Sequence, residues 1–237
     1  MKWLSSLFGN PRSPVEEAQL DRYRHFRELG RAYNLELVKQ LPPPALPESG
    51  KKLGLYKAGT LIINQDDEIA VAYDYCLHHY RRAGKSAIER VLETSPPAVD
   101  SDEMIYLRAM AGSRFSLFRV EDILPHRGAR LHDLVTDVSL DLMDIGLSST
   151  GIPGIIVAGR LLSFDGFNMS SGTLIPVPEP VFESRICSVI SKFMPDRASQ
   201  TARLSPAQSA AFEAQVIRIA LHEGGEDNSF YTDMEVL

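Results

Sequence analysis

The sequence is poor in cysteine and lacks the short motifs of several common enzyme classes. Its 237 residues include two cysteines, Cys76 and Cys187, which form no CxxC pair. This argues against a disulfide framework and a zinc knuckle, and two isolated thiols fit the reducing cytoplasm. The patterns HExxH, GxSxG and GxGxxG are missing too. The signatures of zinc proteases, serine hydrolases and dinucleotide-binding domains are therefore not met.

The chain also lacks a membrane-length apolar run and an excess of positive charge. The apolar stretch 155–162 contains Arg160 and is far shorter than the roughly 20 residues that span a bilayer. The formal net charge of −6 does not favour nucleic acid or anionic lipid. We therefore expect a cytoplasmic protein without a membrane span.

The N-terminal segment is apolar but too short to be a secretory signal. Its large apolar residues are Trp3, Leu4, Leu7 and Phe8. We expect these side chains to dock on the body of the protein. A peripheral membrane contact is the alternative, although one short patch anchors a protein only marginally.

What the sequence does contain is a stretch of strand-like residues between two helical stretches. Val138, Leu140 and Leu142 alternate with polar neighbours, which is typical of a strand with one buried face. Asp165-Gly166 lies between two apolar runs and predicts a hairpin with a tight primed turn. Strands are expected at 114–123, 129–134, 138–144, 154–164 and 168–177. Short strands joined by tight turns predict a small antiparallel barrel or a strongly coiled sheet.

The flanking stretches carry helix signals. Ser13-Pro14-Val15-Glu16 and Ser86-Ala87-Ile88-Glu89 are capping boxes, and a further helix is expected from Asp66. The fold class is thus α+β, in four parts: a helix and proline-rich linker (1–47), a helical region (48–112), the β module (113–178), and C-terminal helices with an acidic tail (179–237). The prolines at 42–44 and 47 predict a semi-rigid polyproline II spacer.

The predicted hairpin offers the first candidate binding surface. Phe164, Asp165, Phe167, Asn168 and Met169 place aromatic and methionine side chains beside a tight turn, a composition suited to a groove for a ligand or peptide. The alternative is that Phe164, Phe167 and Met169 complete the core of the barrel.

A second candidate surface is the basic stretch of the first helix. Arg22, Arg24, Arg27 and Arg31 are interleaved with aromatic residues, a pattern that can bind RNA or DNA by charge and stacking. Acidic residues at 21, 28 and 36 dilute this charge, and a solvated basic face is the alternative.

Other polar residues suggest a catalytic or metal-binding function. His78-His79, with Asp74 one turn earlier, suggests a base oriented by a carboxylate, and a cluster of aspartates suggests hydrolysis or divalent-ion binding. The cluster comprises Asp133, Asp137, Asp141, Asp144 and Asp165. Gly84-Lys85-Ser86 resembles the end of a phosphate-binding loop, but the required upstream glycine is replaced by His79. We assign no catalytic residue, metal or cofactor.

Two segments also carry a family resemblance. Residues 73–81, with Tyr73, Asp74 and Tyr80, and residues 113–118, followed by Leu131-His132-Asp133-Leu134, resemble an uncharacterised bacterial family whose relatives sometimes carry a SEC-C type zinc motif. The similarity covers roughly residues 70–178. It implies no established activity, and zinc does not carry over because the cysteine cluster is missing.

These features favour a non-catalytic protein, an adaptor or accessory subunit, with the β module as its recognition surface. Another protein is the expected partner. The alternatives are a nucleic-acid-associated module using the basic face and a hydrolase built around His78 or the aspartate cluster.

Overall fold

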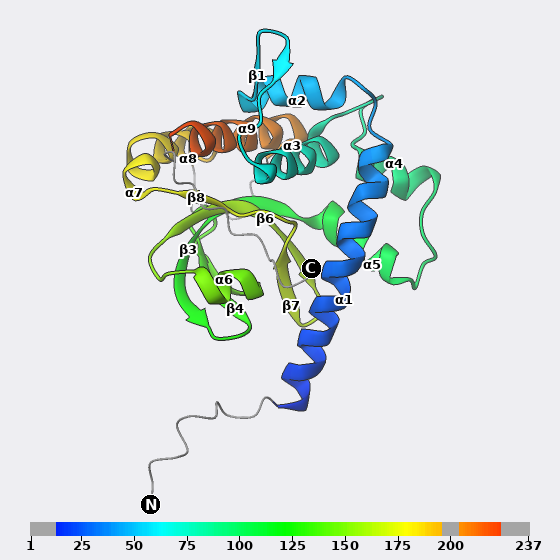
Figure 1. Ribbon diagram of the computed structural model, residues 1–237, viewed down its shortest axis with the longest axis vertical. Helices are drawn as coiled ribbons and strands as arrows, with labels where there is room; N and C mark the ends of the chain where they lie inside the picture. Colours follow the sequence, from blue (N-terminus) through cyan, green and yellow to red (C-terminus); the bar gives the residue numbers. More distant parts are fainter. Residues whose placement is uncertain (1–12, 196–203, 224–237) are drawn as a thin grey trace, which may run out of the picture.

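A β-barrel flanked by helices forms the fold in the computed structural model, which describes residues 13–195 and 204–223 (Figure 1). The helices are α1 (Pro14–Lys39), α2 (Ala45–Leu53), α3 (Asp66–His79), α4 (Ala87–Thr94), α5 (Asp102–Gly112), α6 (Ile145–Thr150), α7 (Glu179–Val181), the π-helical turn η1 (Phe182–Ile186), α8 (Cys187–Phe193) and α9 (Pro206–Glu223). The strands are β1 (Tyr56–Lys57), β2 (Thr60–Leu61), β3 (Arg114–Leu124), β4 (Gly128–Asp133), β5 (Val138–Met143), β6 (Ile156–Phe164), β7 (Phe167–Ser170) and β8 (Ile175–Val177). The predicted α+β class is confirmed.

Local sequence signals fix the helix starts. Ser13 caps α1 and Ser86 caps α4, each in a complete capping box with the glutamate three residues later, Glu16 or Glu89. Such a box satisfies two backbone N–H groups that the helix itself leaves without partners. The predicted helix from Asp66 is confirmed as α3, which ends at His79.

Five strands close into a ring of order β3-β4-β5-β7-β6 and back to β3. Four of the five contacts are antiparallel, and β3 pairs through one half with β4 and through the other with β6. The fifth contact is parallel and short, because β5 meets β7 only at Leu142 and Met143. The small barrel is thus confirmed, with one parallel seam that the sequence did not predict.

The fifth predicted strand, 168–177, is two strands. β7 pairs with the end of β6 and β8 with its beginning, so the chain crosses from one part of β6 to the other at residues 171–174. The predicted hairpin at Asp165-Gly166 is present, with Phe164 paired to Phe167. Only Gly166 has positive φ in the turn, at 87°, so it is not the primed type expected.

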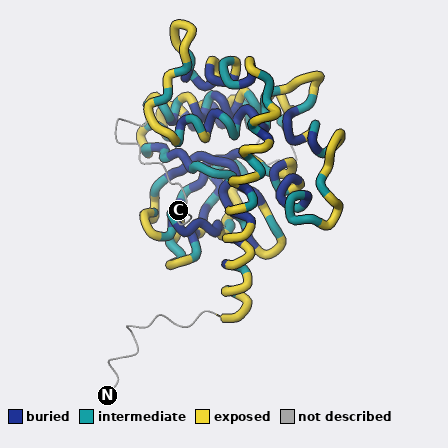
Figure 2. Tube along the Cα trace, turned by 45° about the vertical axis from the view of Figure 1, so that its right-hand side comes forward, coloured by how far each residue is buried: buried dark blue, intermediate teal, exposed yellow. Residues whose placement is uncertain are grey.

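The helices cover the barrel on two sides (Figures 1 and 2). α2, α3, α8 and α9 form a layer that packs on β3, β6 and β8, while α1, α4 and α5 pack beside β7. The barrel has an interior of its own, and its buried members are Phe118, Val120, Ala129, Leu131, Leu142, Leu147, Val157, Leu161 and Leu174.

The proline-rich stretch differs from its predicted structure. Residues 45–47 belong to α2, so the expected break at residue 47 falls within a helix. Pro44 has helical backbone angles, φ −75° and ψ −11°, which makes the proline run a turn between α1 and α2 rather than a polyproline II spacer. No helix in the described part of the chain has both the length and the apolarity that crossing a bilayer requires. The predicted acidic tail and N-terminal docking segment lie outside the described residues, except Glu223.

Candidate functional site

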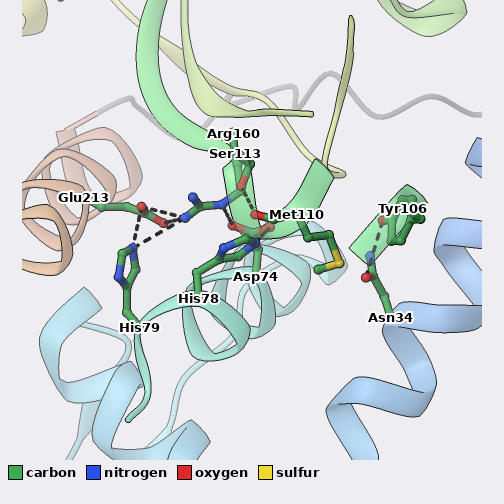
Figure 3. Close-up of polar contacts among 9 residues, drawn as sticks. All are labelled: Asn34, Asp74, His78, His79, Tyr106, Met110, Ser113, Arg160 and Glu213. Carbon is green, nitrogen blue, oxygen red and sulfur yellow. Dashed lines mark hydrogen bonds and ion pairs between the residues drawn. The ribbon is translucent and has the colours of Figure 1, made fainter. Parts of the chain in front are cut away.

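A buried polar network is centred on Arg160 in β6 (Figure 3). Its Nη2 donates to both carboxylate oxygens of Glu213 in α9, at 2.6 and 2.7 Å, and its Nε donates to Oδ2 of Asp74 in α3 at 2.9 Å. One guanidinium therefore links the barrel to two helices. Burial works against its charge, but Glu213 and Asp74 outweigh that effect and raise the pKa of Arg160.

The predicted histidine pair belongs to this network. His79 Nε2 lies 2.7 Å from Oε2 of Glu213. His78 Nε2 is buried 3.9 Å from Asp74 and has no hydrogen-bond partner among the described residues. Burial and the neighbouring Arg160 hold the pKa of His78 well below its usual range, so this imidazole is neutral.

The centre of the network is closed to solvent. Glu213 is 1% exposed and Arg160 is 4% exposed, and neither lines any of the three hollows described below. A hydrolase needs its acid and base within reach of a substrate proton. Burial also raises the pKa of the nearby Cys76 thiol to about 11, which keeps it an inert thiol. The network connects β6 of the barrel to α3 and α9 and so stabilises the packing of these helices.

The aspartate cluster does not converge either. Asp133 is buried, accepts from Ser116 Oγ and caps the turn that follows β4, and buried Asp144 caps α6. Asp137 and Asp165 are exposed at turns, and Asp141 pairs with Arg130 on the barrel surface. No group of three or more potential metal ligands occurs in the described part of the chain.

A groove of about 850 Å³ lies on the barrel surface. Most of its lining comes from β5 and the β6–β7 hairpin, and α1, β3, the β3–β4 loop and β4 contribute one or two residues each. Its apolar members are Leu124, Leu140, Leu142, Met143, Phe164 and Phe167, and its charged members are Glu121, Arg127, Arg130 and Asp141. The charges are balanced and paired: Arg127 contacts Glu16 at 3.2 Å and Arg130 contacts Asp141 at 2.9 Å.

The residues of the predicted hairpin surface lie in three different places. Phe164, Phe167 and Asn168 line the groove. Asp165 instead lines a smaller hollow, about 330 Å³, on the other side of the hairpin. Met169 is 1% exposed and packs against α1.

The two phenylalanines also hold α1 in place, which neither prediction for the hairpin included. Phe164 stacks on Phe167 with ring centroids 5.0 Å apart, and it contacts Phe26 of α1 at 4.5 Å. Tyr23 meets Phe167 edge-on at 6.3 Å. These rings form the interface between helix and barrel rather than the barrel core.

In the described part of the chain, the parallel seam leaves a section of β5 without a strand neighbour on its groove side. Beyond Leu142 and Met143, the described pairing of β5 is with β4. The carbonyl of Asp141 points toward the groove, where it accepts from the Asn168 side chain at 3.0 Å. Because peptide groups alternate along a strand, the N–H and C=O of Ser139 also face the groove.

The basic stretch of α1 does not form a continuous cationic face. Arg27 is buried and donates to the backbone and side chain of Ser170 in β7, both at 2.9 Å. It also lies 3.5 Å from Asp144, whose pKa is raised by burial. Arg24 pairs with Asp21 in the same helix at 3.7 Å, Arg22 lies over the ring of Phe26, and exposed Arg31 lines a hollow of about 80 Å³. Arg27 therefore anchors α1 to the barrel and is unavailable to nucleic acid.

Sequence reasoning missed much of the groove. Gln19, Arg127, Arg130, Ser139 and Leu140 line it, and they come from α1, the β3–β4 loop, β4 and β5. No motif joins these positions, because the barrel closure brings them together. The sequence marks this region by the alternation of apolar and polar residues around Leu140, which predicts a strand with one buried face.

The connectivity defines the class of protein. A ring of order β3-β4-β5-β7-β6, a long first strand shared by two neighbours, and a helix between the third and fourth barrel strands are the features of an OB-type barrel. In such barrels the face of the second and third strands, with the loops at its ends, is the usual ligand surface. The groove lies on the corresponding face, formed here by β4 and β5.

Comparison with known proteins then places the chain in a family. Residues 17–209 match the model of a family of unknown function, DUF7986, and the chain belongs to that family. The match extends well beyond the 70–178 region of the predicted resemblance and includes α1 and the start of α9. No curated protein and no solved structure matches the chain.

Proposed function

We propose that this protein is a non-catalytic binding protein that holds a polypeptide partner in the barrel groove. It would act in the cytoplasm as an adaptor or accessory subunit. The cytoplasmic setting is supported by two free thiols, Cys76 and Cys187. A bacterial origin, which the sequence resemblance implies, belongs to the same proposal.

The observation that carries the proposal is the position of the groove. It lies on the barrel face that OB-type proteins commonly use, and its lining mixes polar and apolar side chains. Because fold alone does not establish function, the argument depends on the side chains present. Half-buried Leu124, Leu140 and Phe164 are apolar surface that a partner would cover.

The chemistry of the groove favours polypeptide over nucleic acid. A nucleic-acid groove needs unpaired cations along its length and free aromatic faces for stacking. Here two arginines face two carboxylates, and both arginines already have acidic neighbours. Phe167 is 7% exposed and stacks on protein rings. The backbone groups of Ser139 support instead an extended segment that pairs with β5.

The test is affinity capture from the native host with matched bait variants. Leu140→Lys places a charge in the groove, and Ile152→Lys places the same charge at a 63% exposed site outside it. We expect protein partners to survive nuclease treatment, to remain with Ile152→Lys and to fall about tenfold with Leu140→Lys. Equal capture of partners by both variants would show that the groove is not their binding site.

The nucleic-acid alternative has its own measurement. Binding of a fluorescein-labelled single strand would weaken steeply with added salt, and Arg24→Glu would weaken it further. We expect no such binding, because the basic stretch is diluted by acidic neighbours and one of its arginines is buried.

A further inference from the structure

A small hollow of about 80 Å³ lies between α1, α5 and the segment that connects β7 to β8. We call it the arginine hollow, and its polar lining residues are Arg27, Arg31, Asn34, Tyr106 and Ser171. Its volume is several times what one buried water needs, so an ion of the size of phosphate fits inside. The arginine hollow shares no lining residue with the barrel groove in the described part of the chain.

The sequence of α1 brings three of these side chains to one side of the helix. Arg27, Arg31 and Asn34 are four and three residues apart, the separations at which side chains are neighbours on a helix surface. Gly30 lies among them, and a Cβ at this position would come 2.7 Å from the Tyr106 hydroxyl. The missing side chain therefore allows Tyr106 of α5 to place its hydroxyl against α1. Burial raises the pKa of Tyr106 to about 12, so this hydroxyl keeps its proton.

The charged side chains that line the arginine hollow are cationic. Among its described lining residues two are arginines and none is acidic, in contrast to the balanced charges of the barrel groove. Arg27 is 6% exposed, donates to Ser170 and lies 3.5 Å from buried Asp144, which offsets its charge. Arg31 adds a second positive charge at the exposed rim. An anion is therefore the class of ligand that this lining favours.

Hydrogen-bond donors on two elements supplement the arginines. The Tyr106 hydroxyl donates to Oδ1 of Asn34 at 3.4 Å, which leaves the Asn34 amide nitrogen as a donor (Figure 3). Across the arginine hollow, the Ser171 hydroxyl and the Gly172 N–H lie at the start of the β7–β8 segment. These three donors have no hydrogen-bond partner among the described residues. All of them belong to half-buried residues, so a ligand that supplies acceptor oxygens would satisfy them.

We propose that the arginine hollow binds a small oxyanion of the phosphate class, either inorganic phosphate or the phosphate group of a small monoester. The donors come from α1 and from the β7–β8 segment, which suits the several acceptor oxygens of phosphate better than a planar carboxylate. Arg31 makes the direct charged contact, while Arg27 keeps its bonds to Ser170 and contributes its charge. The bound oxyanion joins α1 to the segment that follows β7. This site is independent of the groove and of the partner proposed for it.

The test is isothermal titration calorimetry of the full-length protein with sodium phosphate. Sodium chloride keeps the ionic strength constant, because salt screens exposed charges. We expect saturable binding by the wild type and binding at least about tenfold weaker by Arg31→Gln, since a hydrogen bond to a charged group contributes about that factor. Arg24→Gln is the matched control, with the same charge change on the same helix at a residue that pairs with Asp21 outside the arginine hollow. Its affinity should stay within about twofold of the wild type.

An uncharged variant and two further ligands complete the test. Ser171→Ala leaves the charge unchanged and should weaken phosphate binding several-fold, and acetate should bind far more weakly than phosphate. Glycerol phosphate that binds more tightly than inorganic phosphate would identify a monoester as the ligand, and the reverse order would identify the free ion. The proposal is wrong if millimolar phosphate shows no saturable binding, or if acetate binds as tightly. It is also wrong if Arg31→Gln and Arg24→Gln lose affinity equally, or if Ser171→Ala binds phosphate like the wild type.

Discussion

Removal of the Arg160 guanidinium should destabilise the fold more than the loss of any surface ion pair. Arg160→Met keeps most of the side-chain length but leaves Glu213, which is 1% exposed, with His79 as its remaining hydrogen-bond partner. Breaking one side of a buried ion pair costs about 3–5 kcal/mol. For a chain of this size, that corresponds to a decrease in Tm of roughly 10 °C.

The measurement is urea unfolding followed by circular dichroism, with two companion variants. Arg119→Met removes a half-exposed pair with Glu179 and should cost less than about 1 kcal/mol. The double variant Arg160→Met, Glu213→Leu should be more stable than Arg160→Met alone, because no unpaired carboxylate remains buried. An Arg160→Met protein within about 1 kcal/mol of the wild type would refute the bracing role.

Three further changes test other parts of the structure. The pKa of His78 is depressed in the folded state, so below about pH 6.5 the unfolded chain binds a proton that the folded protein does not. The free energy of unfolding should therefore fall as the pH drops below about 6.5, by up to about 1.4 kcal/mol per pH unit. His78→Leu should lose this pH dependence in urea titrations, and an unchanged slope would contradict the assignment. Gly128→Ala would place a Cβ 1.8 Å from the Leu142 carbonyl oxygen, at a φ of 154°, and should cost at least about 2 kcal/mol by thermal unfolding; a neutral change would show that the β4–β5 backbones can separate. Phe167→Ala removes a ring between α1 and the barrel and should cost about 3–5 kcal/mol, with faster hydrogen exchange in α1; unaltered exchange would mean that α1 is held by other contacts.

Much of the fold was predictable because its signals are local. The capping boxes at Ser13 and Ser86 and the turn at Gly166 each act within four residues, and the alternation around Leu140 marks a strand whatever its neighbours are. The polyproline II prediction failed for a related reason. Pro44 stands at the N-cap of α2, and proline is compatible with a helix start as well as with an extended spacer.

The groove was less predictable, because strand register and barrel closure create it. Asn168 meets Asp141 through a parallel seam of two residue pairs, which no sequence pattern marks. Arg27 shows the opposite problem, since its sequence neighbours suggest a basic surface while its partners Asp144 and Ser170 are more than a hundred residues away. Long-range burial of this kind cannot be read from charge spacing along one helix.

The bond between Arg27 and Ser170 has a consequence for synthesis on the ribosome. The two residues are 143 positions apart, so α1 emerges long before the strand that receives it. At about 5–20 residues per second, the delay is roughly 7–30 s. During that interval Leu20, Tyr23 and Phe26, all buried in the finished protein, have no barrel to cover them. The fold therefore requires α1 to carry an uncovered apolar stripe until β7 has been synthesised.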